Sequence, residues 1–298
     1  MTIARRDFLK GAVVGAGGLV LSAPLLAAEA RKTWDPYETV TLGTCGVKTS
    51  RTGIGMGIHG WMRQSNHTRM GKEKAIPVFQ GAFERGIRLF DGADLYGTHQ
   101  MFAEAMAKVP RDKYTLVSKI WINPKGIPEE DRPDADVVVQ RFLKELKTDY
   151  IDILQFHCQT QADWPKLHRR QMDIMDKLKD KGLIRAHGVS CHSIEALEAA
   201  AAEPWVDVVH ARINHKGLMM DDTPEKVVPV LRKLHKAGKG VIGMKLVGNG
   251  KWKDAPAERD AAARFVLGLG CVTAQIVGFE AVEQIDEHAA RVRAIART

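Results

Sequence analysis

The stretch GIRLFDGADLYG, from Gly86 to Gly97, carries the pattern that decides the fold. Its short apolar run, Ile87 to Phe90, follows an amphipathic segment that closes on a glycine, and it leads directly into an acid, Asp91. This pattern predicts a helix that ends on a glycine and is followed by a buried strand. The phenol of Tyr96 then falls in the loop that we expect after the strand.

The same unit recurs on both sides of this stretch. Strands are predicted at Thr52 to Met56, Ile87 to Phe90, Tyr114 to Lys119, Tyr150 to Phe156, Ala186 to Ser190, Val206 to Arg212, Gly240 to Lys245 and Thr273 to Val277. Helices are predicted at Glu73 to Arg85, His99 to Lys108, Ala135 to Lys147, Trp164 to Lys181, Ile194 to Ala202, Pro224 to Lys236, Ala257 to Leu267 and Ala281 to Ala296. Eight such pairs without a linker predict one α/β domain, a closed (β/α)₈ TIM barrel.

An open, doubly wound sheet is the competing architecture. It normally carries a glycine-rich dinucleotide turn after its first strand, with a helix directly behind it. The sequence Gly53-Ile54-Gly55-Met56-Gly57 lacks both the spacing and the helix. We therefore interpret Gly55 and Gly57 as a turn that brings the backbone close to a ligand at the barrel mouth.

Composition and charge narrow the functional classes. The chain has 298 residues, of which 45% are hydrophobic and 27% charged, so it can bury a sizeable core. Its formal net charge is +8, but the basic residues are spread along the chain and interleaved with acids. No basic patch interleaved with aromatic residues accompanies the charge, and we expect no nucleic-acid partner.

The first thirty residues have the character of a targeting segment. ARRDFLK, from Ala4 to Lys10, precedes an apolar stretch from Gly11 to Leu26 and the small-x-small pattern Ala28-Glu29-Ala30. This arrangement resembles a twin-arginine export signal, which implies the twin-arginine translocase as a partner and a folded, periplasmic protein. We expect a signal at residues 1–30, a barrel domain at 31–298, and no stable membrane span after cleavage; an uncleaved anchor is the alternative.

Four ionisable side chains lie at or just past the ends of three predicted strands. Asp91 and Tyr96 follow the second strand, Lys119 ends the third and His157 follows the fourth. In a (β/α)₈ barrel, the chemistry sits at the carboxyl ends of the strands. An acid, a phenol, an ammonium and an imidazole gathered there can tune one another's protonation, which proton transfer to a carbonyl requires.

Five stretches resemble the aldo-keto reductase family. They are Val40 to Gly57, which resembles that family's opening β-hairpin and first strand, and Gly86 to Gly97, Val117 to Trp121, Leu143 to His157 and Gly188 to Ser193. The resemblance implies an oxidoreductase that reduces a small carbonyl compound, an aldehyde, ketone or sugar. By the same resemblance Tyr96 donates the proton, Lys119 and Asp91 tune it, and His157 orients the substrate oxygen.

The resemblance also implies a nicotinamide cofactor, NADP or NAD, because no side chain supplies a hydride. The family's contacts to it are altered here: Ser190 is followed by Cys191 instead of Asn, and His210 replaces an expected Gln. Lys245 stands where the family has an aromatic or small residue, and it is expected to meet a phosphate or to form a salt bridge. Gly278, before the last helix, is expected to offer a backbone N–H to a phosphate.

Two other functions remain open from the sequence. Histidines and cysteines near strand ends suggest a metal-dependent lyase or hydrolase, although no metal-binding spacing occurs and we assign no metal site. A barrel that binds a sugar or another small ligand without turnover is the second alternative. Trp61 and Trp121 would offer such a barrel flat apolar faces, and in the reductase they are expected to line the substrate pocket. A disulfide between Cys158 and Cys191 is geometrically possible if strands four and five are neighbours.

Overall fold

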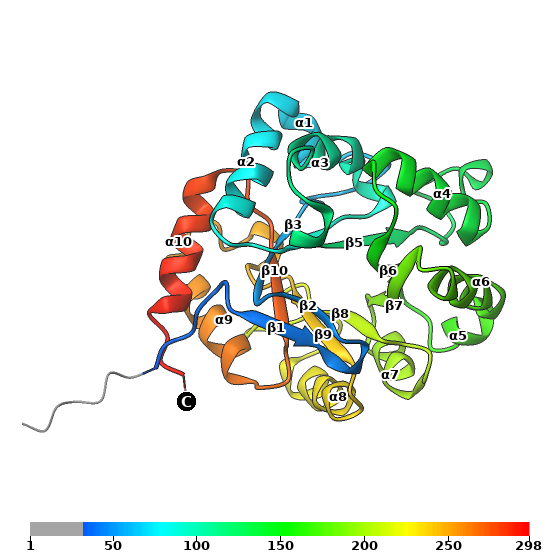
Figure 1. Cartoon of the computed structure of the whole chain (residues 1–298). Coiled ribbons are helices and arrows are strands. Elements are labelled where there is room, and N and C mark those ends of the chain that lie inside the picture. The colour runs from blue at the N-terminus through cyan, green and yellow to red at the C-terminus, as the bar shows by residue number, and fades with distance from the viewer. Residues whose placement is uncertain (1–31, 298) are drawn as a thin grey trace, which may run out of the picture. The chain divides into compact units, whose positions relative to one another are not determined.

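The computed structural model describes residues 32–297, and these form a closed barrel of eight parallel strands. The order around the barrel is β10-β3-β4-β5-β6-β7-β8-β9. Figure 1 looks along it, with helices surrounding the strands. The strands are β3 (Thr52–Gly55), β4 (Leu89–Asp91), β5 (Thr115–Ile120), β6 (Ile151–Gln159), β7 (Ile184–Cys191), β8 (Val208–Arg212), β9 (Gly240–Met244) and β10 (Ala274–Val277). The predicted barrel is confirmed.

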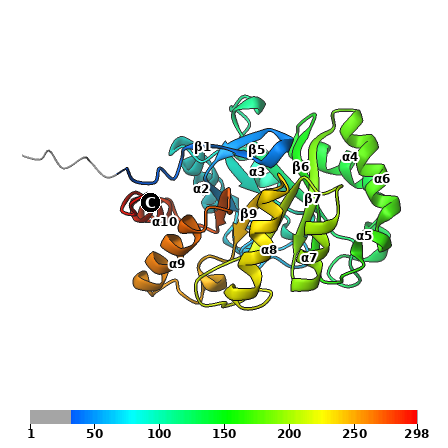
Figure 2. The same cartoon turned by 90° about the horizontal axis from the view of Figure 1, so that it is seen from below.

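Helices alternate with the strands and cover the outside of the barrel (Figure 2). They are α1 (Asn66–Met70), α2 (Lys72–Glu84), α3 (His99–Ala105), α4 (Ala135–Leu146), α5 (Trp164–Leu167), α6 (Arg169–Asp180), α7 (Ile194–Ala202), α8 (Pro224–Lys236), α9 (Pro256–Gly268) and α10 (Val282–Arg293). The single helix predicted from Trp164 to Lys181 is in fact two, separated at His168. No helix within residues 32–297 is both long and apolar enough to cross a membrane.

Successive side chains of each strand point alternately into and out of the barrel, and the inward ones fill its interior. One layer of apolar residues from the strands forms a single buried cluster: Leu89, Val117, Ile153, Ala186, Val208, Ile242 and Ala274. Residues two positions later on the same strand point to the same side. The strand residues that follow this layer therefore also face the interior, nearer the carboxyl ends of the strands, where function is expected.

A β-hairpin closes the opposite end of the barrel. Strands β1 (Thr39–Leu42) and β2 (Val47–Ser50) pair antiparallel, and Val40, Leu42 and Val47 belong to the same apolar cluster as the barrel interior. The predicted N-terminal hairpin is thus present, and its apolar side chains cover the amino-terminal end of the barrel interior. Because it fills the amino-terminal end, only the other end can admit a ligand to the interior.

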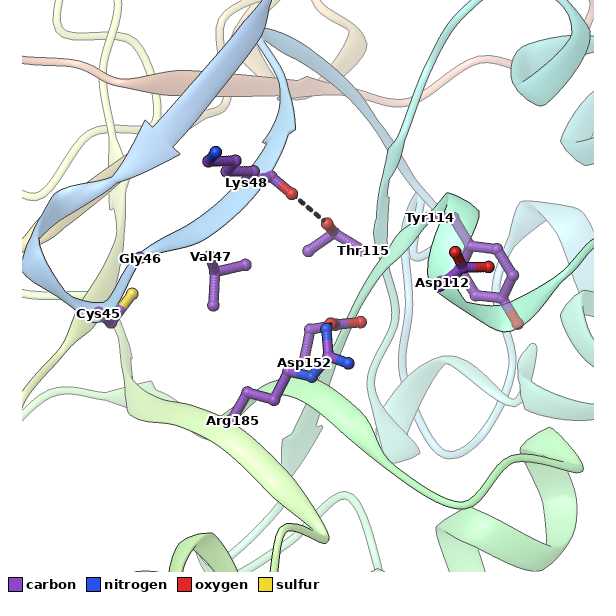
Figure 3. A pocket seen from close by; sticks show the side chains of 9 residues that line it. All are labelled: Cys45, Gly46, Val47, Lys48, Asp112, Tyr114, Thr115, Asp152 and Arg185. Carbon is purple, nitrogen blue, oxygen red and sulfur yellow. Dashed lines mark hydrogen bonds and ion pairs between the residues drawn. The ribbon is translucent and has the colours of Figure 1, made fainter.

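A cavity of about 350 Å³ lies beside the hairpin at this amino-terminal end (Figure 3). Thr115, at the start of β5, donates a hydrogen bond of 2.8 Å from its hydroxyl to the Lys48 carbonyl oxygen of β2. Asp152 and Arg185, near the starts of β6 and β7, form an ion pair of 3.0 Å on its wall. The Thr115 hydrogen bond ties the hairpin to β5, whereas the ion pair joins β6 to β7. None of the predicted catalytic residues lines the cavity.

Candidate active site

The inward register brings the predicted catalytic residues together. Asp91 lies two residues after Leu89 on β4, and Lys119 lies two residues after Val117 on β5. His157 lies four residues after Ile153 on β6. All three side chains are therefore directed into the barrel above its apolar layer. β6 continues to Gln159, so His157 belongs to the strand instead of following it as predicted.

Asp91 and Lys119 form a buried ion pair. Their side chains are 3% and 1% exposed, and the Lys119 ammonium also donates a hydrogen bond of 2.9 Å to the Gly92 carbonyl oxygen. Burial alone would raise the pKa of the Asp91 carboxyl, but the Lys119 charge and the His210 ring hold that pKa well below its usual range. Burial lowers the pKa of Lys119 against the opposing effect of Asp91. The carboxylate thus fixes the position of the ammonium.

His210 is a third member of this buried group. Its Nε2 lies 3.1 Å from the same Asp91 oxygen that Lys119 contacts, although the angle falls outside good hydrogen-bond geometry. Burial is the main cause that lowers the pKa of His210, so its ring is neutral at neutral pH. The residue predicted as a cofactor contact therefore also touches the catalytic carboxylate.

The side chains of Tyr96 and His157 contact each other beside the buried Asp91–Lys119 pair. The Tyr96 hydroxyl and His157 Nε2 are 3.3 Å apart, and their rings cross edge to face. Burial, assisted by the Asp91 charge, raises the pKa of the Tyr96 phenol well above its ordinary value. Burial and the Lys119 charge lower the pKa of His157 well below its ordinary value. The resting pair is consequently neutral, with the phenol proton in place.

The expected tuning of Tyr96 by Lys119 is weaker in this arrangement than the sequence suggests. The Lys119 nitrogen lies 5.3 Å from the centre of the Tyr96 ring and is already paired with Asp91. Lys119 is therefore a cation beside the phenol, and its pairing with Asp91 reduces the stabilisation that it offers a phenolate.

The position of Tyr96 depends on two contacts that the sequence did not reveal: one with Gly57, which was predicted to approach a ligand, and one made by Asp94. A methyl group at Gly57 would come within 2.4 Å of the Tyr96 ring carbons, so only glycine leaves room for the ring there. Asp94, two residues before Tyr96, is buried and forms ion pairs with Arg63 (3.0 Å) and Arg141 (2.6 Å). These contacts anchor the short 3₁₀ turn from Asp94 to Tyr96 to a loop and to α4.

The other predicted cofactor residues surround the same mouth but differ in what they can offer. The Ser190 hydroxyl accepts a hydrogen bond of 2.8 Å from the Cys158 N–H and keeps its own O–H free to donate. Cys191 is a buried free thiol, whose pKa is raised well above the ordinary value by burial. Gly278 packs against the Ile58 side chain, so a side chain at 278 would collide with the loop that follows Gly55.

Trp61 and Trp121, the residues expected to line a substrate pocket, lie together beside His157. The Trp121 ring packs edge to face against His157 at 5.3 Å and against Trp61 at 5.6 Å between ring centres. Trp121 is buried, whereas Trp61 is 47% exposed. The indole N–H of Trp121 donates a hydrogen bond of 2.6 Å to the Lys125 carbonyl oxygen, which fixes the ring. A substrate that approaches His157 therefore passes an apolar wall.

A metal-binding cluster and a disulfide are both absent from the part of the chain that is described. Residues 32–297 contain no group of three or more His, Cys, Asp or Glu side chains arranged to hold a metal ion. All four cysteines are free thiols, so Cys158 and Cys191 do not form a disulfide.

Comparison with known proteins agrees with this geometry. A family model described as "Aldo/keto reductase family" matches residues 53–290. A probable aldo-keto reductase 1 from Glycine max is 28% identical over 72% of this chain and 60% of its own length. The aldo-keto reductase YhdN from Bacillus subtilis is 29% identical over 64% of this chain and 57% of its own length. The match thus spans less than two thirds of these relatives.

Solved structures show the same fold. An aldo-keto reductase from Bacillus halodurans, in its holo form, superposes with a TM-score of 0.69 at 20% identity, over 88% of this chain and 93% of its own. An aldo/keto reductase from Klebsiella pneumoniae, solved with NADP and acetate, superposes with a TM-score of 0.65 at 18% identity, over 87% of this chain and 91% of its own. Since the family model covers most of the chain, the protein belongs to the aldo/keto reductase family.

Proposed function

We propose that this protein is an exported, nicotinamide-dependent oxidoreductase that reduces the carbonyl group of an aldehyde, ketone or sugar. One observation carries the proposal: the phenol of Tyr96 lies 3.3 Å from His157 and next to the buried Asp91–Lys119 pair, at the end of the barrel that the hairpin leaves open. The family membership supports the reaction class.

In this proposal Tyr96 donates the proton that the substrate oxygen needs. Its pKa is raised by burial, so the phenol carries its proton at neutral pH. As the proton leaves, negative charge grows on the phenolic oxygen, and the fixed Lys119 ammonium stabilises it. Asp91 holds that ammonium in place, and the neutral His157 orients the substrate oxygen beside the phenol. Proton donation of this kind accelerates a reaction by roughly 10² to 10⁴.

The groups that would hold the cofactor fit a carboxamide. The Ser190 hydroxyl has a free donor, and Nδ1 of His210 is a buried nitrogen without a partner among the described residues. One donor and one acceptor are what a carboxamide's oxygen and NH₂ group require. A bound reduced nicotinamide, NADPH or NADH, supplies the hydride. The NADP bound to the Klebsiella pneumoniae enzyme supports this choice of cofactor.

A Tyr96→Phe variant tests the assignment of the proton donor. We expect kcat/KM for a carbonyl substrate to fall by roughly 10² to 10⁴, with little change in the thermal midpoint, because only the hydroxyl is lost. Tyr150→Phe is the matched control, since Tyr150 precedes β6 at the amino-terminal end of the barrel. If both variants keep wild-type activity, Tyr96 is not the donor. If the purified wild-type protein binds neither NADH nor NADPH, the reductase proposal is refuted.

Export is part of the proposal and rests on the sequence alone. The pair Arg5-Arg6, the apolar stretch after it and the pattern Ala28-Glu29-Ala30 support a twin-arginine signal, and all of them lie outside the described residues. Such a route delivers a folded protein to the periplasm, with its cofactor enclosed. Fractionation of cells that express the chain with Arg5→Lys and Arg6→Lys should show the protein retained in the cytoplasm. Equal export of wild type and variant would contradict the signal assignment.

A further inference from the structure

Lys245 lies at the mouth of the barrel and carries a charge that no carboxylate balances. It follows the last residue of β9, Met244, and its backbone is in the left-handed region, with φ of 63°. Its ammonium donates one hydrogen bond of 2.8 Å, to the Asn249 side-chain oxygen. No Asp or Glu among residues 32–297 lies within ion-pair distance of it. An ammonium has three donors, so two remain for a ligand.

Arg212 provides a second available donor beside Lys245. In the barrel Arg212 of β8 pairs in register with Met244 of β9, so Lys245 is the next residue beyond that pair. Arg212 is bound to Asp221 and donates from Nη2 to the His192 carbonyl oxygen at 2.7 Å. Its other terminal nitrogen, Nη1, has no hydrogen-bond partner among the described residues. Both side chains are only partly exposed.

The charges at this part of the mouth leave a surplus of one positive unit. Lys119 is balanced by Asp91 and Arg212 by Asp221, whereas Lys245 has no counter-charge. Burial and the neighbouring Arg212 lower the pKa of Lys245, so both the low-polarity surroundings and a like charge work against the ammonium. A bound anion would compensate both effects. The left-handed backbone adds a further cost that a lysine without a ligand leaves unexplained.

We propose that Lys245 and Arg212 form an oxyanion-binding site for a carboxylate or phosphate group of the substrate. The assignment to the substrate rests on the proposed function, because Lys245 shares the mouth with the residues that would reduce its carbonyl. Lys245 directly follows β9, so it lies at the same carboxyl end of the barrel strands as Asp91 and Lys119. The substrate class that fits is an aldehyde or ketone with an anionic group elsewhere in the molecule. The bound charge then selects among carbonyl compounds and orients them.

Titration of inorganic phosphate and of acetate into the full-length protein tests the site without any turnover. We expect wild type to bind them, Lys245→Gln to bind roughly tenfold to a hundredfold more weakly, and Lys245→Arg to bind close to wild type. Lys251→Gln is the matched control, because Lys251 is an exposed lysine on the same loop. The site is refuted if wild type binds neither anion, or if Lys245→Gln binds them as well as wild type.

Two further measurements identify the source of the anion. The first compares kcat/KM for 4-oxobutanoate and for butanal, which differ by a carboxylate. We expect Lys245→Gln to lower the value for 4-oxobutanoate by roughly tenfold to a hundredfold more than the value for butanal. The second measures the Kd of NADH and of NADPH. If these weaken while the preference for 4-oxobutanoate persists, the site holds a cofactor phosphate and the substrate assignment is wrong. If no carbonyl is reduced, the proposed function fails and the phosphate titration still decides the site.

Discussion

Removal of the Asp91 charge is the sharpest test of the buried group at the centre of the site. Asp91→Asn keeps the size of the side chain and removes its charge. The variant leaves the Lys119 ammonium inside the barrel without a counter-charge, with the Gly92 carbonyl oxygen and the new amide oxygen as neutral hydrogen-bond acceptors. Lys119 is 1% exposed and His210 is 0% exposed, so water cannot take the place of the lost carboxylate without a rearrangement.

The size of the effect follows from this burial. Loss of one member of a buried ion pair costs about 3–5 kcal/mol, since it leaves an uncompensated charge. For a domain of this size that corresponds to a fall in the thermal midpoint of roughly 6 to 20 °C. Asp112→Asn is the control, because Asp112 pairs with Lys113 at 3.2 Å on the surface, where both side chains are more than half exposed. Such a pair contributes close to nothing.

A double variant separates the buried charge from a general loss of packing. Lys119→Met removes the ammonium and keeps most of the side-chain volume, so Asp91→Asn combined with Lys119→Met leaves no unpaired ammonium. We expect the double variant to be more stable than Asp91→Asn alone, measured by urea unfolding at pH 7. The reasoning is refuted if Asp91→Asn is no more destabilising than Asp112→Asn, or if the effects of the two buried substitutions simply add.

Three further outcomes follow from the same geometry. Gly57→Ala should lower kcat/KM at least tenfold with a small stability change, because its methyl group displaces the Tyr96 ring. Gly268→Ala is the control, since the space around Gly268 is open. Equal activity of the two variants would contradict the role of Gly57 in positioning Tyr96. Asp94→Asn should destabilise the protein by about 1–3 kcal/mol in urea unfolding and slow turnover, since Arg63 and Arg141 lose their shared carboxylate. Unchanged stability would show that Asp94 does not anchor the turn that carries Tyr96. Burial lowers the pKa of His288 to about 4. Between pH 6.5 and pH 4, His288 is therefore protonated in the unfolded chain and neutral in the folded protein, so the free energy of unfolding decreases as the pH falls through this range. His288→Leu should therefore reduce the stability lost from pH 7 to pH 5 by about 2 kcal/mol in urea unfolding; an unchanged pH dependence would contradict the lowered pKa.

The barrel was predictable because its information is local. Each strand shows an apolar run and each helix an amphipathic period, and a glycine such as Gly86 or Gly182 marks the turn between them. The convergence of the residues predicted to be catalytic could be anticipated for the same reason, since strand ends define the site in this fold. The break at His168 was missed because α5 and α6 continue one another in sequence with no glycine between them.

What the sequence could not supply are the contacts between strands that are distant along the chain. The approach of His210 to Asp91 depends on the stagger of β4 and β8 around the closed barrel, and no sequence period encodes it. The anchoring of Asp94 by Arg63 and Arg141 likewise joins three separate segments. The isolation of Lys245 is visible only when every neighbouring carboxylate has been assigned to another partner.

The mouth of the barrel divides electrostatically into two parts. On the side of β4 to β6, the buried Lys119 is paired with Asp91, and Tyr96 and His157 are neutral. This state suits a proton donor, because the phenol keeps its proton until the substrate oxygen demands it. On the side of β8 and β9, Lys245 retains an unbalanced charge. A neutral carbonyl compound can interact with Tyr96 and His157 but cannot balance the charge of Lys245. A substrate that does both must carry its own negative charge at a fixed distance from the carbonyl.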